Sequence, residues 1–198
     1  MIKRIFDIVF SALGLVFLAP LFAIVAIIIK IDSRGPVFFC QERMGKDFIP
    51  FRIYKFRTMT ENAEREGSAI TVGGDRRITG TGKFLRKYKI DEFPQLLNVL
   101  KGDMSFVGPR PEVEEYVELY RSEYRKLLRV RPGITDPASL RYSNEEEVLA
   151  SSQAWEEDYK KNILPAKINL SMQYVENHDL FMDLKLISRT VLKTSLFR

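Results

Sequence analysis

The chain has 198 residues, of which 45% are hydrophobic and 29% are charged, a composition typical of a folded domain with its own core. Its net charge of +5 favours anionic partners such as nucleic acid or anionic lipid. The single cysteine, Cys40, excludes an intramolecular disulfide and a cysteine-rich metal site. Because His178 is the only histidine, a zinc site built on histidines is disfavoured as well.

The first long apolar segment predicts entry into a membrane. Residues 5–29 are apolar apart from Asp7 and Ser11, and a straight helix of this length, at about 1.5 Å per residue, could cross a bilayer core. A cleaved signal peptide is disfavoured, because the run exceeds the usual apolar region and Pro20 follows Ala19 where a cleavage site would be sought.

Basic residues flank this segment on both sides, namely Lys3, Arg4, Lys30 and Arg34. The positive-inside rule therefore draws both ends to the cytoplasm, which a straight spanning helix cannot satisfy. Pro20, near the middle, removes a backbone hydrogen bond and kinks a helix. We therefore expect a re-entrant helix-break-helix over residues 1–34, with both of its ends on one face of the membrane.

A β-hairpin is expected next. Residues 37–42 and 49–56 alternate weakly in hydropathy around a glycine-containing turn. Lys55 and Arg57 lie at its end, either as solvated strand-end charges or as cations that approach a substrate or lipid headgroups. The polar, glycine-rich stretch 60–81 is interpreted as a loop that borders the site, and it lacks a P-loop pattern.

Two adjacent carboxylates, Asp91 and Glu92, begin an apolar run that ends at Lys101 and Gly102. Asp91 suits the N-cap of a helix, Pro94 suits its first turn and Gly102 suits its C-terminal end. The pattern therefore predicts a helix, and capping alone would be enough to explain Asp91.

Cations surround this carboxylate pair, namely Arg86, Lys87, Lys89 and, between Pro109 and Pro111, Arg110. Proteins usually hold Mg²⁺ with one or two carboxylates plus substrate phosphate oxygens, and guanidinium groups bind phosphate in a bidentate manner. The flanking prolines stiffen the backbone around Arg110, so it loses little entropy on binding a ligand. The arrangement indicates a site for a metal-bound ligand that carries phosphate.

The second half of the chain is predicted to be helical. Helices are expected over 111–128, 144–161, 164–177 and 180–198, the last one amphipathic and basic. Glu112 is placed in the first turn of the first of these helices, where we interpret it as structural. Arg131, in the turn RPGIT, is a further candidate for a phosphate or nucleotide contact.

The string DEFPQLLNVLKGDMSFVGPRP, residues 91–111, resembles the core motif of the monotopic phosphoglycosyl transferases, bacterial enzymes that load a sugar phosphate onto a polyprenyl phosphate carrier. The resemblance extends to FRIYKFRTM at 51–59, to RPGIT at 131–135 and to the membrane-seeking N-terminus. It is weakest from 136 to about 177. Together with the elements above, it implies an α/β, mainly helical fold: a re-entrant hairpin over 1–34 and one small catalytic domain over 35–198.

The resemblance implies that Asp91 and Glu92 are catalytic. Asp91 would attack the β-phosphate of a nucleoside diphosphate sugar, expected to be a UDP-sugar, and release UMP, after which polyprenyl phosphate would take the sugar phosphate from the aspartate. Mg²⁺ bound by Asp91 would neutralise the developing charge. Glu92 would either assist the metal or activate the lipid phosphate. The expected phosphate and substrate contacts are Lys55, Arg57, Arg86, Arg110 and Arg131.

The expected partners are a UDP-sugar, polyprenyl phosphate and lipid of the bacterial inner membrane, at its cytoplasmic face; nucleic acid is not expected, and the oligomeric state is left open. The alternative is a basic, non-catalytic membrane-surface scaffold that binds anionic lipid, which leaves the carboxylates among arginines unexplained. The chain departs from the family pattern at Asp136-Pro137-Ala138-Ser139, where a glycine and later a glutamine are common, and at Ser171, where an acid is common. The sugar and the glycan pathway therefore stay open.

Overall fold

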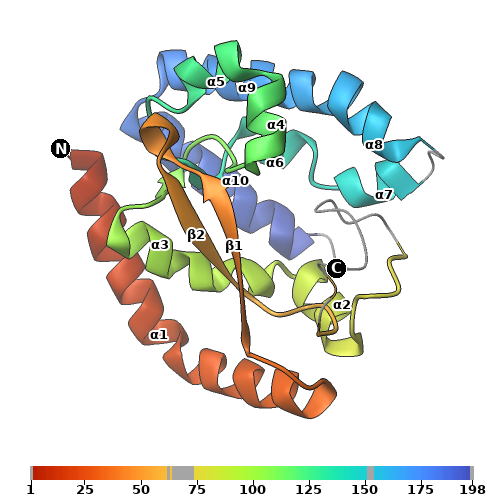
Figure 1. Cartoon of the computed structure of the whole chain (residues 1–198). Coiled ribbons are helices and arrows are strands. Elements are labelled where there is room, and N and C mark those ends of the chain that lie inside the picture. Colours follow the sequence, from red (N-terminus) through yellow and green to blue (C-terminus); the bar gives the residue numbers. More distant parts are fainter. Residues whose placement is uncertain (1, 62, 64–73, 151–153, 197–198) are drawn as a thin grey trace.

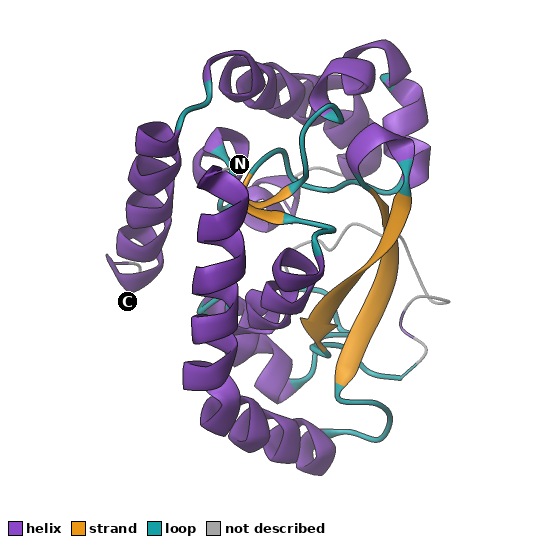
Figure 2. Ribbon diagram, turned by 90° about the vertical axis from the view of Figure 1, so that its left-hand side faces the viewer, coloured by secondary structure: helices purple, strands orange, loops and turns teal. Residues whose placement is uncertain are grey.

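The computed structural model describes residues 2–61, 63, 74–150 and 154–196. Figures 1 and 2 show helices arranged around two small sheets, so the predicted, mainly helical fold with a short hairpin is confirmed. The helices are α1 Ile2–Asp32, α2 Gly80–Lys87, α3 Leu96–Lys101, α4 Glu114–Leu119, α5 Arg121–Leu127, α6 Pro137–Arg141, α7 Glu145–Ala150, α8 Trp155–Asp158, α9 Leu164–Asn177 and α10 Leu180–Leu196. The strands are β1 Phe38–Met44, β2 Pro50–Phe56, β3 Ser105–Val107 and β4 Gly133–Thr135. Shorter turns are the 3-10 helices η1 Lys46–Phe48 and η3 Ile90–Gln95 and the π-helix η4 Tyr159–Ile163.

The apolar segment forms one helix, α1, with Pro20 inside it. Its two halves run in different directions in Figure 1. The helix is bent but not interrupted, because proline removes only one hydrogen bond of the ladder. By length and composition α1 could cross a membrane, and its outer face is apolar, with Val16 73% and Phe17 78% exposed. Its re-entrant path through a membrane stays a prediction.

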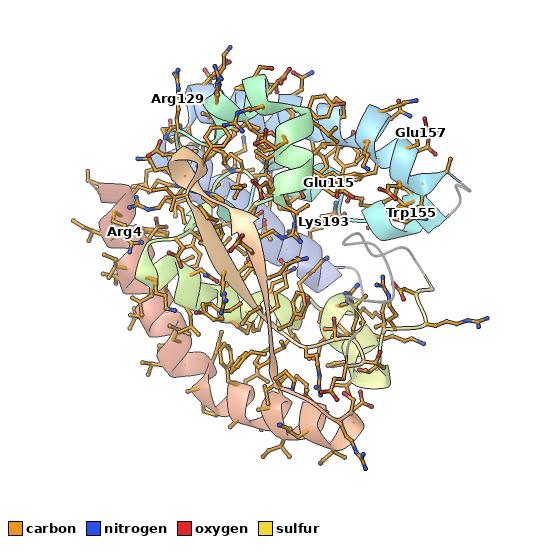
Figure 3. The ribbon with its side chains drawn as sticks, viewed as in Figure 1. Arg4, Glu115, Arg129, Trp155, Glu157 and Lys193 are labelled. Carbon is orange, nitrogen blue, oxygen red and sulfur yellow. The ribbon has the colours of Figure 1, made fainter. Side chains whose placement is uncertain are left out.

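Polar contacts join the first half of α1 to the rest of the protein. Asp7 is buried and accepts hydrogen bonds from Ser105 Oγ and from the Phe106 backbone N–H, both at 3.1 Å. Arg4 donates to the carbonyls of Val99 and Leu100 at the end of α3, at 2.6 and 3.0 Å (Figure 3). The start of α1 is thus fixed to α3 and β3.

The second half of α1 shares a hydrophobic core with later elements. Val25 and Ile29 are buried against Phe56 of β2 and Leu85 of α2. The buried Arg57 donates to the carbonyls of Ser33 and Arg34 at 2.7 and 2.6 Å, just after the helix ends. Both ends of α1 therefore contact later parts of the chain. The division at residue 34 into a membrane hairpin and a catalytic domain stays a prediction.

The predicted hairpin is confirmed. Strands β1 and β2 pair in antiparallel register from Phe38↔Phe56 to Met44↔Pro50. The tip of the hairpin is attached to the end of α5, since Asp47 N–H donates to the Leu128 carbonyl at 2.8 Å. Ile53 packs against α3 and the loop after it. Because Lys55 lies two residues further along on the same face of the strand, it also points toward this part of the protein.

The GPRP motif follows β3 directly and lies beside the RPGIT motif, which contains β4, the parallel neighbour of β3. Gly108 N–H donates to the Thr135 carbonyl and Gly133 N–H to the Pro109 carbonyl, both at 3.0 Å. A Cβ on either glycine would collide with the backbone of the other motif. The RPGIT turn thus fixes the backbone directly before Arg110.

The prediction of one helix over 111–128 is wrong. Two helices, α4 and α5, replace it and meet at Tyr120, whose φ of −127° and ψ of 42° are not helical. This break lets Tyr116 and Tyr124 enter one core while the Tyr120 hydroxyl donates to the Lys160 carbonyl at 2.8 Å.

The helices expected over 164–177 and 180–198 are confirmed as α9 and α10. Of the expected loop 60–81, residues 62 and 64–73 lie outside the described residues, as do residues 151–153 of the helix expected over 144–161.

Candidate active site

Asp91 and Glu92 lie in the first turn of η3, which leads directly into α3. Lys89 begins this turn in the left-handed conformation, with a φ of 55°, and the turn has no side-chain cap in the described part of the chain. The prediction that Asp91 is the N-cap is therefore wrong. Pro94 has no N–H to donate to Ile90, so the first turn closes by the shorter bond from Glu92 N–H to the Lys89 carbonyl, at 3.2 Å.

Asp91 is 7% exposed, and its Oδ1 (the open oxygen) has no hydrogen-bond partner among the described residues. A buried polar atom without a partner costs stability. The position of Asp91 is thus not explained by capping, and its open oxygen, which is enclosed by protein, lacks a partner that a bound ligand would supply.

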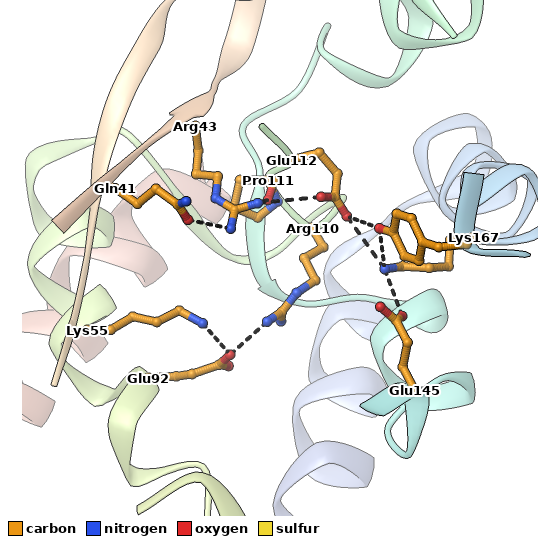
Figure 4. Close-up of polar contacts among 10 residues, drawn as sticks. Gln41, Arg43, Lys55, Glu92, Arg110, Pro111, Glu112, Glu145 and Lys167 are labelled. Carbon is orange, nitrogen blue, oxygen red and sulfur yellow. Dashed lines mark hydrogen bonds and ion pairs between the residues drawn. The ribbon is translucent and has the colours of Figure 1, made fainter. Parts of the chain in front are cut away.

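Glu92, in contrast, is held by two cations (Figure 4). Its Oε1 accepts from Lys55 Nζ at 3.0 Å and from Arg110 Nη2 at 2.8 Å. Lys55 comes from β2 and Arg110 from the loop after β3. Three elements that are distant in sequence therefore converge on one carboxylate oxygen.

The two carboxyl groups differ in their ionisation. Burial raises the pKa of Asp91 to about 6, with the charge of Lys55 opposing this rise and the charge of Glu92 adding to it. Burial acts in the same direction on Glu92, but the charges of Arg110 and Lys55 outweigh it and hold the pKa of Glu92 well below its usual range. The charge of Glu92 in turn raises the pKa of Arg110. Such a divergence between neighbouring carboxyl groups is typical of sites that give them different tasks.

The other predicted phosphate contacts are placed unequally. Arg86 Nε donates to Thr58 Oγ1 at 2.9 Å, and its charge lowers the pKa of Asp91, so it belongs to the surroundings of the site. Arg57 binds the carbonyls that follow α1, and Arg131 donates to the Gly102 carbonyl at 2.7 Å, at the end of α3 remote from Asp91. Arg57 Nη2 also donates to the Ile29 carbonyl in the last turn of α1 at 3.4 Å, and carbonyls at helix C-termini need such donors. The structure does not bring Arg57 and Arg131 to the Glu92 cluster.

A buried polar network beside Arg110 was missed from the sequence. It consists of Gln41, Arg43, Glu112, Glu145, Tyr159 and Lys167 (Figure 4). Glu112 precedes α4 instead of lying in a helical turn, and it is 8% exposed. Its position directly after GPRP was the one signal that could have linked it to the site.

The described residues include no group of three or more His, Cys, Asp or Glu side chains that could hold a metal ion by themselves. A Mg²⁺ site that is completed by substrate phosphates needs only one or two carboxylates. The open oxygen of Asp91 is such a donor, whereas Glu92 Oε1 is already occupied by two cations. The residues present fit Mg²⁺, which Asp91 would hold together with substrate phosphate oxygens.

Comparison with known proteins identifies relatives along nearly the whole chain. The family model described as bacterial sugar transferase matches residues 1–196. The UDP-N-acetylgalactosamine-undecaprenyl-phosphate N-acetylgalactosaminephosphotransferase of Aeromonas hydrophila is 39% identical over 195 residues, which cover 96% of this chain and 43% of that protein. The uncharacterized sugar transferase EpsL of Bacillus subtilis is 37% identical over 192 residues, or 97% of this chain and 86% of EpsL. The UDP-glucose:undecaprenyl-phosphate glucose-1-phosphate transferase of Caulobacter vibrioides is 38% identical over 192 residues, which cover 96% of this chain and 68% of that protein.

These relatives differ in length and in the sugar that their names give. The chain spans less than half of the Aeromonas protein but most of EpsL. One name specifies N-acetylgalactosamine and another specifies glucose, so the similarity does not select a sugar. The match to the family model and the identity to EpsL establish the family itself: the chain belongs to the bacterial sugar transferases.

Proposed function

We propose that this chain transfers a sugar 1-phosphate from a UDP-sugar to undecaprenyl phosphate, at the cytoplasmic face of the bacterial inner membrane. The observation that carries the proposal is the buried Asp91, whose open oxygen lies beside a glutamate held by two cations. The names of the relatives supply the substrate class, since those from Aeromonas and Caulobacter act on UDP-sugars and undecaprenyl phosphate.

The reaction proceeds in two displacements at one phosphorus atom. A carboxylate oxygen of Asp91 attacks the β-phosphorus of the UDP-sugar, an oxygen–phosphorus bond forms, and the bond to the bridging oxygen breaks, so that UMP leaves with the electron pair. A phosphate oxygen of undecaprenyl phosphate then attacks the same phosphorus and breaks its bond to Asp91. The carboxylate is regenerated, and the product is a diphosphate-linked lipid sugar.

The cations around Asp91 hold the phosphates. The side chain of Arg110 is 34% exposed and its guanidinium can bind phosphate in a bidentate manner, and Lys55 and Arg86 add positive charge. Mg²⁺, when bound by Asp91 and phosphate oxygens of the substrate, supplies further charge neutralisation. Of the tasks considered for Glu92, the pairing at its Oε1 favours neither metal binding nor activation of the lipid phosphate. It supports a third, in which Glu92 orients Lys55 and Arg110.

Membrane association follows from the lipid acceptor. The exposed apolar face of α1 enters the bilayer in this proposal. Contacts of Asp7 and Arg57 hold both ends of α1 against the catalytic body, which supports a re-entrant path more than a straight crossing. Bending at Pro20 allows both ends to stay on one side.

The test offers the purified protein in detergent a panel of UDP-sugars, with and without a short-chain polyprenyl phosphate, and measures UMP and the lipid product. With acceptor, one UDP-sugar should give continuous UMP release and a lipid-linked sugar. Without acceptor, release should stop at about one UMP per enzyme, because the aspartate stays occupied. Turnover that needs acceptor for the first UMP would exclude the covalent step. Absence of UMP with every sugar, together with binding to anionic vesicles, would favour the scaffold.

A further inference from the structure

The network around Glu112 is not used by either displacement, and it lies directly behind Arg110 (Figure 4). Glu112 Oε1 accepts from the Tyr159 hydroxyl at 3.0 Å and pairs with Lys167 Nζ at 3.5 Å. On its other side, Glu112 Oε2 pairs with Arg43 Nη1 at 3.5 Å. Three separate elements, β1, η4 and α9, thus hold one buried carboxylate.

Two further groups complete the network. Lys167 has a side chain that is only 8% exposed, and its Nζ pairs with Glu145 at 2.9 Å and donates to the Tyr159 hydroxyl at 3.2 Å. Arg43 Nη2 donates to Gln41 Oε1 at 2.6 Å. Arg43 and Lys167 are positive, whereas Glu112 and Glu145 are negative, so the network is neutral as a whole.

A buried ionic network of this kind is a poor device for stability alone. The cost of desolvating the charges often exceeds their mutual attraction, and apolar residues of similar volume can stabilise a core as well. In some proteins a buried ionic network instead fixes geometry, because each charged group accepts only a few arrangements of its partners. The network is therefore better explained by a role in positioning a neighbouring group than by stability alone.

The neighbouring group is Arg110. Gly133 N–H donates to the Pro109 carbonyl, Arg43 Nη1 to the Pro111 carbonyl at 3.4 Å, and Met44 N–H to the Glu112 carbonyl at 2.9 Å. The backbone on both sides of Arg110 is therefore held, on one side by β4 and on the other by the strand that carries Arg43. The charges of Glu112 and Glu145 also act on Arg110, adding to the effect of Glu92 in raising its pKa.

We infer that Glu112 is a positioning residue, which sets the place of Arg110 beside Glu92 through its contacts with Arg43, Tyr159 and Lys167. The inference rests on the proposed function, since Arg110 is the group that holds the substrate phosphates. Glu112 also balances two cations, the partly buried Arg43 and the buried Lys167, that would otherwise repel the Arg110 guanidinium.

The first experiment compares Glu112→Gln with Glu115→Gln, the same chemical change on the exposed face of α4 (Figure 3), where Glu115 pairs with Lys160. Glu112→Gln should lower kcat/KM at least about tenfold, whereas Glu115→Gln should stay within about twofold of wild type. In the variant Glu112→Gln/Lys167→Met, one charge of each sign is removed and neutrality returns, so activity should recover in part. A further loss of activity in this double variant would refute the charge-balancing role of Glu112.

The deciding measurement is a double-mutant cycle with Arg110→Lys. If Glu112 acts through the guanidinium fork of Arg110, Glu112→Gln should cost less than about twofold in the Arg110→Lys protein. An equal loss in both backgrounds, or no loss in either, would overturn the inference. If Glu112→Gln does not fold, Tyr159→Phe enters the same cycle, because it removes a donor to Glu112 without changing charge. Wild-type protein that releases no UMP refutes the proposed function, whereas active wild type with an additive cycle refutes only the role of Glu112.

Discussion

Asp91→Asn separates the two explanations of this residue, because the amide keeps the shape of the side chain and loses its charge. As a nucleophile, Asp91 cannot be replaced by an amide, so turnover should be lost almost completely. As a helix cap, it could be replaced, since Asn caps about as well as Asp. The structure already places Asp91 inside the first turn of η3 without a capping bond.

The same substitution should stabilise the metal-free protein. Burial raises the pKa of Asp91 from 3.8 to about 6, and this difference of about two units, at about 1.4 kcal/mol per unit, corresponds to about 3 kcal/mol. The folded state thus favours the protonated carboxyl group. The carboxylate therefore lowers the free energy of unfolding by the full amount above about pH 6, and this effect is absent below about pH 4. Asn should therefore stabilise at pH 8 by up to about 3 kcal/mol, and the gain should disappear as the pH falls to about 4.

Thermal unfolding in detergent with EDTA measures this effect. A gain of about 3 kcal/mol corresponds to roughly 6 to 12 °C in Tm for a chain of this size. Asp47→Asn is the matched control, since Asp47 is exposed at the hairpin tip and Asn tolerates its left-handed backbone. Mg²⁺ added in the presence of UMP, which supplies phosphate oxygens, should raise the Tm of wild type more than that of Asp91→Asn. An Asn variant that is less stable at pH 8, or that keeps more than about a tenth of the activity, would refute the reasoning.

The remaining predictions concern the cations and α1. Arg110→Lys keeps the charge without the bidentate fork, so kcat/KM should fall at least about tenfold at unchanged Tm; full activity would remove Arg110 from the site. Arg131→Ala should leave kcat/KM unchanged and cost about 1 kcal/mol of stability, because Arg131 binds the Gly102 carbonyl; a large loss of activity would support the substrate contact predicted from the sequence. Asp7→Ala should destabilise by about 1 to 3 kcal/mol, seen as a lower Tm, because the Phe106 N–H loses its acceptor; an unchanged Tm would exclude that anchor. In a Cys40→Ser background, Ile2→Cys and Arg34→Cys should both be shielded from an impermeant reagent in intact cells, and labelling at one end only would establish a spanning helix.

The parts of the fold that local patterns govern were predictable from the sequence. The alternation in hydropathy around the hairpin turn predicted β1 and β2. The apolar run before Gly102 predicted the end of α3, where Gly102 has a φ of 98°. The start of η3 was not predictable in this way, because Lys89 adopts a left-handed backbone that lysine rarely takes. That one residue moved Asp91 from the expected cap into the turn.

The site was predictable only in part, because some of the candidate cations bind backbone carbonyls near helix ends instead of joining the Glu92 cluster. Lys55 and Arg110 reach Glu92, but Arg57 and Arg131 bind carbonyls after α1 and at the end of α3. Composition and motif do not distinguish an arginine that caps a helix from one that binds phosphate. Glu112 and Lys167 are 55 residues apart, so their contact follows from the packing of α9 and has no local signature.

The 3-10 geometry of η3 explains how two adjacent carboxylates come to have different environments. With about three residues per turn, consecutive side chains point in directions roughly 120° apart, so Asp91 and Glu92 make different direct contacts even though the charge of Lys55 acts on both. Glu92 faces the hairpin and the loop after β3, and therefore meets Lys55 and Arg110. Asp91 is buried on another side, where no described donor reaches its open oxygen. One extra residue between the two carboxylates would turn Asp91 by a further third of a turn about the helix axis. The direct adjacency of Asp91 and Glu92 therefore sets the direction of the proposed nucleophile, Asp91, relative to the cations bound by Glu92.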